Sequence, residues 1–144
     1  MRWILLDEVV AIEKGKRARA RGRIPEGEFN AEFLLMEMMA QTGGILAGAE
    51  THYQQDYIFA KIEQAWFEAS KWKPGEGIQI EVSCELIRPE GGWFDGTVRS
   101  ESQPLLASSR FLLMNVGLLR PETGKPVTFS NNFMQHYQIA EKFR

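Results

Sequence analysis

The sequence AEFLLMEMMAQTGGILAGAET, residues 31–51, is rich in Leu, Met and Ala and contains no proline. Asparagine is a favoured helix cap, and Asn30 directly precedes this run. The pattern therefore predicts one long helix over residues 31–51. Its large apolar side chains point in nearly every direction around the helix axis, so we expect a sheet to wrap around it.

The flanking regions are predicted to form strands. A hairpin over residues 2–12 and 17–24 turns at Lys14, Gly15 and Lys16. The clearest two-residue alternation runs from Ile78 to Leu86, where every second residue is apolar. Further strands are expected at residues 57–67, 93–102 and 105–116, and a short amphipathic helix at 131–142.

These elements predict an α+β fold in which a curved antiparallel sheet packs around one central helix. The expected domain covers residues 1–116. Residues 117–144 are expected to form an extension that packs on the same domain or on a neighbouring subunit.

Composition narrows the classes of function. The chain has 144 residues, with 17 Lys plus Arg against 19 Asp plus Glu, so its net charge is −2. Nucleic acid is not an expected partner, because phosphate binding requires an excess of clustered cations. The longest apolar stretch, residues 33–49, contains Glu37, Gln41 and three glycines, so no membrane-spanning segment is expected.

Cysteine and histidine are scarce. With Cys84 as the only cysteine and no secretory leader, we expect a cytoplasmic protein without an internal disulfide. One cysteine and two histidines, His52 and His136, are too few for an ordinary zinc site, so no metal is expected. Neither histidine has sequence neighbours that suggest a catalytic triad, and both are expected to be structural.

Glu37 is the main anomaly, because it lies inside an apolar run of a helix that should be largely enclosed. Desolvation raises the pKa of a carboxyl group, and a neutral carboxyl can donate a proton at neutral pH. The alternatives are that Glu37 lies on an exposed stripe of the helix or forms an ion pair with an arginine across an interface.

Gln41 lies one turn after Glu37 on the same helix face. Its amide is expected either to orient the carboxyl or to satisfy a backbone group. Gly43 and Gly44 each cost about 1 kcal/mol in a helix interior relative to alanine, so a close approach should explain them. Either a neighbouring strand or a thin ligand chain is expected to lie close to these two glycines.

Four arginines, Arg17, Arg19, Arg21 and Arg23, alternate with small or apolar residues. Because a strand repeats every two residues, all four guanidinium groups project from one face. This face is either a solvated outer surface or a docking patch for an acidic partner.

The helix also carries a resemblance to a known family. Residues 37–44, EMMAQTGG, resemble the central-helix signature of the 3-hydroxyacyl-acyl-carrier-protein dehydratases, which have the hot-dog fold. The resemblance covers about residues 1–116. Its other matching segments are residues 3–9, 15–17, 59–67, 73–76 and Met114.

The resemblance implies dehydration of a 3-hydroxyacyl thioester to the trans-2-enoyl product, without cofactor or metal, in fatty-acid or related lipid or polyketide biosynthesis. Two side chains from two subunits do this work in the family. Glu37 corresponds to the glutamate that handles the departing hydroxyl, and a histidine in the preceding loop removes the α-proton. Gln41 and Gly44 match helix positions to which we assign no catalytic step. The resemblance also implies a homodimer, or a higher homo-oligomer built of dimers.

The sequence departs from the family in the loop before the helix. The family has a histidine there and a Pro-Gly whose amide holds the thioester carbonyl, but residues 23–33, RIPEGEFNAEF, contain neither. Gly15 and Glu37 are 37 − 15 = 22 positions apart, which is shorter than in the family and indicates a deletion. Loss of a base costs about 10²–10⁴-fold in rate, so ordinary dehydration should be nearly silenced.

Three functions stay open on the sequence alone. They are a modified dehydratase acting on acyl-carrier-protein or CoA thioesters, a hot-dog thioesterase in which Glu37 activates water, and a non-catalytic acyl-binding or scaffold subunit. If an acidic carrier protein docks, its expected contacts are Arg17, Arg19, Arg21, Lys71 and Lys73.

Overall fold

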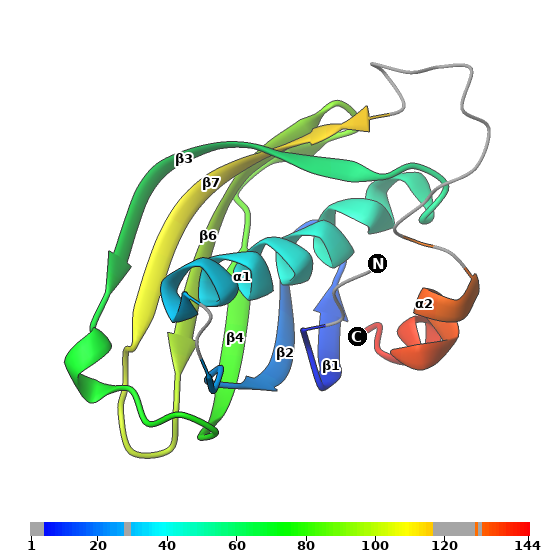
Figure 1. Cartoon of the computed structure of the whole chain (residues 1–144). Helices are drawn as coiled ribbons and strands as arrows, with labels where there is room; N and C mark the ends of the chain where they lie inside the picture. Colours follow the sequence, from blue (N-terminus) through cyan, green and yellow to red (C-terminus); the bar gives the residue numbers. More distant parts are fainter. Residues whose placement is uncertain (1–4, 28–29, 117–128, 130) are drawn as a thin grey trace.

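The structure, a computed structural model, describes residues 5–27, 30–116, 129 and 131–144. A seven-stranded antiparallel sheet curves around one long helix, α1 (Ala31–Gly48), as Figure 1 shows. The strand order is β1-β2-β4-β6-β7-β3, and β5 pairs with β6. The strands are β1 (Glu8–Glu13), β2 (Arg17–Arg23), β3 (Tyr57–Phe67), β4 (Gly77–Ser83), β5 (Ile87–Arg88), β6 (Gly91–Arg99) and β7 (Ala107–Asn115). The predicted α+β class is confirmed.

The central helix begins where the sequence predicts. The Phe33 N–H donates to Oδ1 of Asn30 at 3.2 Å, which caps the helix. The α-helix ends at Gly48 and continues as the 3₁₀ turn Ala49–Thr51. Among the described helices, none is long and apolar enough to cross a membrane.

The core lies between α1 and the concave face of the sheet. Leu35, Met39 and Leu46 are fully buried, as are Phe94 and Phe111 on the sheet. Each such side chain contributes about 1.5–3 kcal/mol by leaving water. This burial holds one side of α1 against β2, β4, β6 and β7.

The ends of several strands differ from the prediction. β1 begins at Glu8, whereas the predicted strand began at residue 2; residues 2–4 lie outside the described part. β4 ends at Ser83; the Cys84 N–H still bonds to the Lys16 carbonyl, and the chain then turns into β5. Leu86 is consequently 62% exposed instead of facing the core.

The predicted helix over residues 131–142 is also shorter than expected. α2 (Asn131–His136) ends before Gln138, whose φ of 51° is left-handed and breaks the helix. A 3₁₀ turn, Ile139–Glu141, follows it.

The C-terminal segment packs along β1, where Figure 1 places α2 and the chain end. The Tyr137 hydroxyl donates to the Leu6 carbonyl at 2.8 Å. The Ile12 N–H donates to the Lys142 carbonyl, and the Arg144 N–H donates to the Ile12 carbonyl. The end of the chain therefore satisfies both backbone groups of Ile12 at this sheet edge.

The opposite sheet edge is formed by β3, which pairs on one side with β7. In the described part of the chain no strand pairs with its other side. Its large apolar side chains Ile58, Ile62 and Trp66 are 43%, 45% and 40% exposed. β3 is thus an open edge of eleven residues with apolar side chains on it.

Candidate functional site

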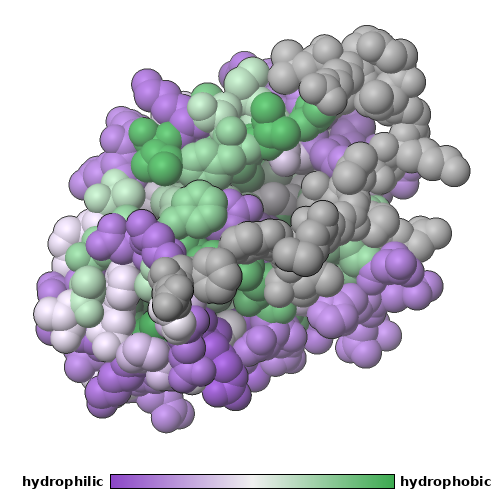
Figure 2. Space-filling model, in the orientation of Figure 1, coloured by the Kyte–Doolittle hydropathy of each residue, from purple (hydrophilic) through white to green (hydrophobic). Residues whose placement is uncertain are grey.

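Glu37 lies on the side of α1 that the sheet leaves uncovered. Figure 2 shows this side of the molecule, with apolar side chains gathered between hydrophilic rims. Glu37 is half-buried, and burial raises the pKa of its carboxyl above the ordinary value. No hydrogen bond or ion pair joins it to another described residue. A half-buried carboxyl with a raised pKa and no partner can hold and donate a proton.

Gln41 and Gly44 continue the same face of α1. The Gln41 Oε1 accepts a hydrogen bond from the Leu5 N–H at 3.4 Å, so its amide satisfies a backbone group. A Cβ at Gly44 would meet nothing within 4 Å, whereas a Cβ at Gly43 would lie 3.0 Å from the Phe111 ring. Sheet packing therefore explains Gly43, and nothing in the described chain explains Gly44.

We name the α1 stripe by its four members, Phe33, Glu37, Gln41 and Gly44, which recur every three or four residues along one helix face. Phe33 is 59% exposed, one turn before Glu37. Sequence inspection missed Phe33 as part of the site. The spacing from Phe33 to Glu37 and Gln41 was the available signal, but burial of the other faces was needed to interpret it.

Neither histidine accompanies Glu37. His52 is exposed, and fifteen residues of helix and turn separate it from Glu37, which corresponds to about 22 Å. His136 is exposed on α2, where its ring contacts Tyr137 with centroids 4.7 Å apart. The structure gives no catalytic role to either histidine within one chain.

The loop before α1 is short. Residues 24–30 join β2 to the helix. The Ile24 N–H donates to the Glu76 carbonyl, and the Gly75 N–H donates to the Ile24 carbonyl, which ties the loop's first residue to the neighbouring turn. The loop sequence holds no histidine that could serve as a base beside Glu37.

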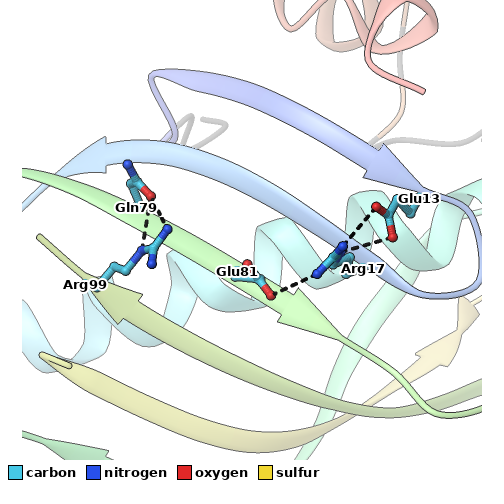
Figure 3. A network of polar contacts seen from close by, with 5 residues as sticks. All are labelled: Glu13, Arg17, Gln79, Glu81 and Arg99. Carbon is cyan, nitrogen blue, oxygen red and sulfur yellow. Dashed lines mark hydrogen bonds and ion pairs between the residues drawn. The ribbon is translucent and has the colours of Figure 1, made fainter. Parts of the chain in front are cut away.

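The four arginines project from one face of β2, as the alternation predicts, and this is the convex face turned away from α1. Figure 3 shows Arg17 between Glu13, at 3.0 Å, and Glu81, at 4.0 Å. Arg21 and Arg23 pair with Glu8 at 3.2 Å and Asp7 at 3.7 Å. Arg19 has no ion pair with a described residue.

A hollow of about 510 Å³ lies on this arginine face, lined in part by Arg19, Arg21, Gln79 and Arg99. Arg99 donates two hydrogen bonds to Oε1 of Gln79, at 3.1 and 2.8 Å, and to no described carboxylate. The sheet and α1 separate this hollow from Glu37.

The two candidate lysines lie elsewhere. Lys71 belongs to the 3₁₀ turn Ala69–Lys71 after β3, and Lys73 follows it. The next turn, residues 73–76, adjoins the Arg23 end of β2, where Arg23 donates to the Gly75 carbonyl at 3.2 Å. Arg17 lies at the other end of that strand. The five candidate docking residues therefore do not form one patch.

Metal ligation finds no support among the described residues. No three His, Cys, Asp or Glu side chains in this part of the chain come together as a metal ion requires. Cys84 is buried, and burial raises the pKa of its thiol, which makes it a poor ligand and nucleophile.

Comparison with known proteins identifies the family. No family model matches the chain. The 3-hydroxyacyl-[acyl-carrier-protein] dehydratase FabZ of Thiobacillus denitrificans is 31% identical over 126 residues, covering 77% of this chain and 85% of that protein. This chain belongs to the 3-hydroxyacyl-acyl-carrier-protein dehydratase family. The Bacillus subtilis FabZ is 30% identical over 101 residues, covering 62% of this chain and 70% of that protein.

Solved structures share the hot-dog fold of this dehydratase family member. The dehydratase heterocomplex ApeI:P from Xenorhabdus doucetiae matches with a TM-score of 0.65 at 15% identity, covering 81% of this chain and 90% of that one. The protein smu.793 from Streptococcus mutans, bound to acetyl CoA, matches with a TM-score of 0.63 at 17% identity, covering 88% and 95%. A hypothetical thioesterase from Streptococcus pneumoniae matches with a TM-score of 0.61 at 12% identity, covering 75% and 88%.

Proposed function

We propose that this protein dehydrates 3-hydroxyacyl thioesters, with Glu37 as the general acid that protonates the departing hydroxyl. The observation that supports this role is the half-buried Glu37 carboxyl on the open side of α1, which has no partner among the described residues. In the reaction a water molecule takes the α-proton, the C–H electron pair forms the double bond, and the C–O bond breaks as the hydroxyl takes the Glu37 proton and leaves as water; Glu37 then regains a proton from solvent. The raised pKa keeps the Glu37 proton available to that leaving group.

The proposed substrate is a thioester of an acyl carrier protein or of coenzyme A. The curated relatives are named for the carrier protein, and a structural neighbour is described with acetyl CoA bound. We further propose a homodimer joined at the open edge of β3, since that edge exposes unpaired backbone and apolar side chains. A cytoplasmic location is proposed because the chain has a single, buried cysteine.

A thioesterase is the second candidate, because a structural neighbour is described as one. Glu37 would then act as general base on water and would have to be ionised at the working pH. Burial opposes ionisation of this carboxyl, which favours the acid role over the base role.

One assay separates these functions. The purified protein is incubated with 3-hydroxyacyl and saturated acyl thioesters of several chain lengths, while enoyl absorbance and free thiol are followed together. We expect enoyl product, lost at least 100-fold in Glu37→Gln and retained in Glu32→Gln, whose side chain is exposed on the first helical turn. Release of free thiol by the unmodified protein that is lost in Glu37→Gln would establish the thioesterase. The absence of both enoyl product and free thiol would establish a non-catalytic subunit.

The docking role of Arg17, Arg19, Arg21, Lys71 and Lys73 is likewise a proposal. Arg17 and Arg21 already form ion pairs with carboxylates of their own chain. A carrier protein would therefore gain most binding free energy from an ion pair with Arg19. We expect Arg19→Glu to weaken carrier binding more than Arg17→Glu, and salt to weaken binding of the unmodified protein. Binding that is equal in both variants, or insensitive to salt, would refute docking on this face.

A further inference from the structure

A second group of polar side chains lies on the convex face of the sheet, away from Glu37. The hollow of about 510 Å³ on this face runs from β1, across β2 and β4, to β6 and the loop that follows it. Its size is within the range of about 300–1,000 Å³ that small-molecule sites occupy. Three arginines but one acidic side chain, Glu81, are among the residues that line it. In a chain with a net charge of −2, this hollow is therefore locally positive.

Strand register brings the three arginines toward one another across β4. Arg21 on β2 and Arg99 on β6 both pair with Gln79, so their Cα atoms lie about 10 Å apart on the two sides of β4. Arg19 comes two residues before Arg21 on the same face, where it lies opposite Glu81 in the strand register. Arginine side chains that extend from both sides can therefore reach one ligand lying above β4.

Arg99 is held in place by a neutral partner. Oε1 of Gln79 accepts hydrogen bonds from Nε and Nη2 of Arg99 at 3.1 and 2.8 Å, and Figure 3 shows the guanidinium turned toward Gln79 on β4. A guanidinium has five N–H donors, and the other three of Arg99 have no acceptor among the described residues. These bonds orient the Arg99 guanidinium over β4 without neutralising its charge.

Arg19 and Arg21 differ in how their charges are balanced. Arg21 forms an ion pair with Glu8 at 3.2 Å. Arg19 forms no ion pair with a described residue, and the Glu81 carboxylate opposite it lies 4.0 Å from another arginine of β2. Of the three arginines, Arg19 and Arg99 are thus the two whose charges a bound anion would neutralise.

The rim of the hollow is apolar on two sides. Val10 lies on the β1 side, and Pro104 and Leu105 form a wall on the β6 side, where Leu105 is 37% exposed. The Leu106 N–H donates to the Val98 carbonyl at 2.7 Å, which ties the end of this wall to β6. The fold itself therefore holds an apolar surface beside the arginines.

We propose that this hollow binds a small phosphate monoester with an apolar body, whose phosphate lies between Arg19 and Arg99 and whose body packs on Leu105. A phosphate monoester carries a charge of about −1.5 to −2 at pH 7 and three acceptor oxygens, which match two guanidinium groups. A carboxylate carries a single charge and would leave one of the two arginines without a counterion. The arginine face is turned away from α1 (Figure 3), so the inference does not rest on the dehydration proposed for Glu37.

Binding of phenyl phosphate to the full chain tests this site. The compound joins a phosphate monoester to an apolar ring, and isothermal titration calorimetry at low ionic strength measures its affinity and stoichiometry. We expect one molecule to bind per chain. Phenyl sulfate has the same ring but a single charge, and it should bind about tenfold more weakly, because it forms one charge-assisted contact fewer. Inorganic phosphate has no ring and should also bind more weakly than phenyl phosphate.

Substitutions test the residues that hold the ligand. Arg19→Gln and Arg99→Gln should each weaken phenyl phosphate binding about tenfold, because each removes hydrogen bonds from a charged donor. Leu105→Ser should weaken the binding of phenyl phosphate and leave that of inorganic phosphate unchanged. Arg88→Gln, at an exposed arginine of β5 that does not line the hollow, is the matched control and should bind as the unmodified protein does. Circular dichroism verifies that each variant is folded.

Three results would overturn the inference. They are no binding of phenyl phosphate to the folded protein, equal binding by the unmodified protein and both arginine variants, and equal affinity for phenyl phosphate and phenyl sulfate. Weaker binding to Glu37→Gln would place the probe beside Glu37 and would also overturn the site. Binding that Glu37→Gln leaves unchanged, in a protein that forms no enoyl product, would refute the dehydration and uphold this site.

Discussion

Glu37 combines partial burial with an absence of partners among the described residues, and its pKa therefore links to stability. An unfolded-chain glutamate has a pKa of about 4.3, and burial raises the pKa of Glu37 in the folded protein. The stabilisation from this shift is complete below the unfolded pKa and is lost as the pH rises through the folded pKa.

We therefore expect the difference in free energy of unfolding between Glu37→Gln and wild type to rise in favour of the variant from about pH 4 upward. This difference should level off above the folded pKa of Glu37. Glutamine does not ionise, so the variant does not lose this stabilisation as the pH rises. Urea titrations between pH 4 and pH 8 measure the difference. Glu32→Gln, at an exposed position, serves as the control; identical pH trends for both variants would contradict the raised pKa.

Gly48 is packed so closely by two aromatic rings that it has no room for a side chain. A Cβ at this position would lie 2.7 Å from the rings of both Tyr53 and Phe129. Gly48→Ala should therefore lower the free energy of unfolding by about 1–3 kcal/mol, despite alanine's better helix propensity. Urea denaturation checks this against Gly77→Ala, where a Cβ meets nothing within 4 Å and no loss is expected.

Among the elements, the C-terminal segment depends on a few long-range hydrogen bonds. The buried Tyr137 hydroxyl donates to the Leu6 carbonyl, 131 positions away in sequence. Tyr137→Phe leaves that carbonyl without its donor and should cost about 1–2 kcal/mol of stability. It should also speed amide exchange at Ile12 and Arg144, which form the adjoining backbone bonds. The exposed Gln135→Ala should leave both measurements unchanged.

The elements that the sequence predicts well are those with local signals. The Asn30 cap, the alternation from Ile78 to Val82 and the arginine face of β2 all appear in the structure. Two features were not predictable, because they depend on residues far away in sequence. They are the turn of the chain away from β4 after Ser83 and the bonds of Ile12 to Lys142 and Arg144.

The candidate site also has features that the sequence predicts and features that only the packed structure reveals. Glu37 stood out as a carboxyl inside an apolar run, and the missing histidine was visible from the loop sequence alone. The exposure of Phe33 and the empty space at Gly44 required the packed structure, because they depend on which side of α1 the sheet covers.

For the whole molecule, the homodimer proposed above predicts that turnover depends on association of two copies. Specific activity should rise with protein concentration and level off where sedimentation shows a mass twice the 16.5 kDa of one chain. Ile62→Asp should shift both curves together to higher concentration, because it places a charge on the exposed β3 edge at which the homodimer is proposed to join. Glu101→Lys, on an exposed loop, is the matched control. Activity independent of concentration, with a monomer mass, would contradict the proposed homodimer.

The bonds from Ile12 to Lys142 and Arg144 also decide how far sheets of this protein can grow. A sheet with two free edges can add copies without end, as a filament does. Here residues 142–144 occupy part of the β1 edge, and no strand in the described part of the chain pairs with the outer side of β3. In the proposed homodimer, edge-to-edge joining uses β3 alone, and the bonds of Ile12 oppose further growth of the sheet at β1.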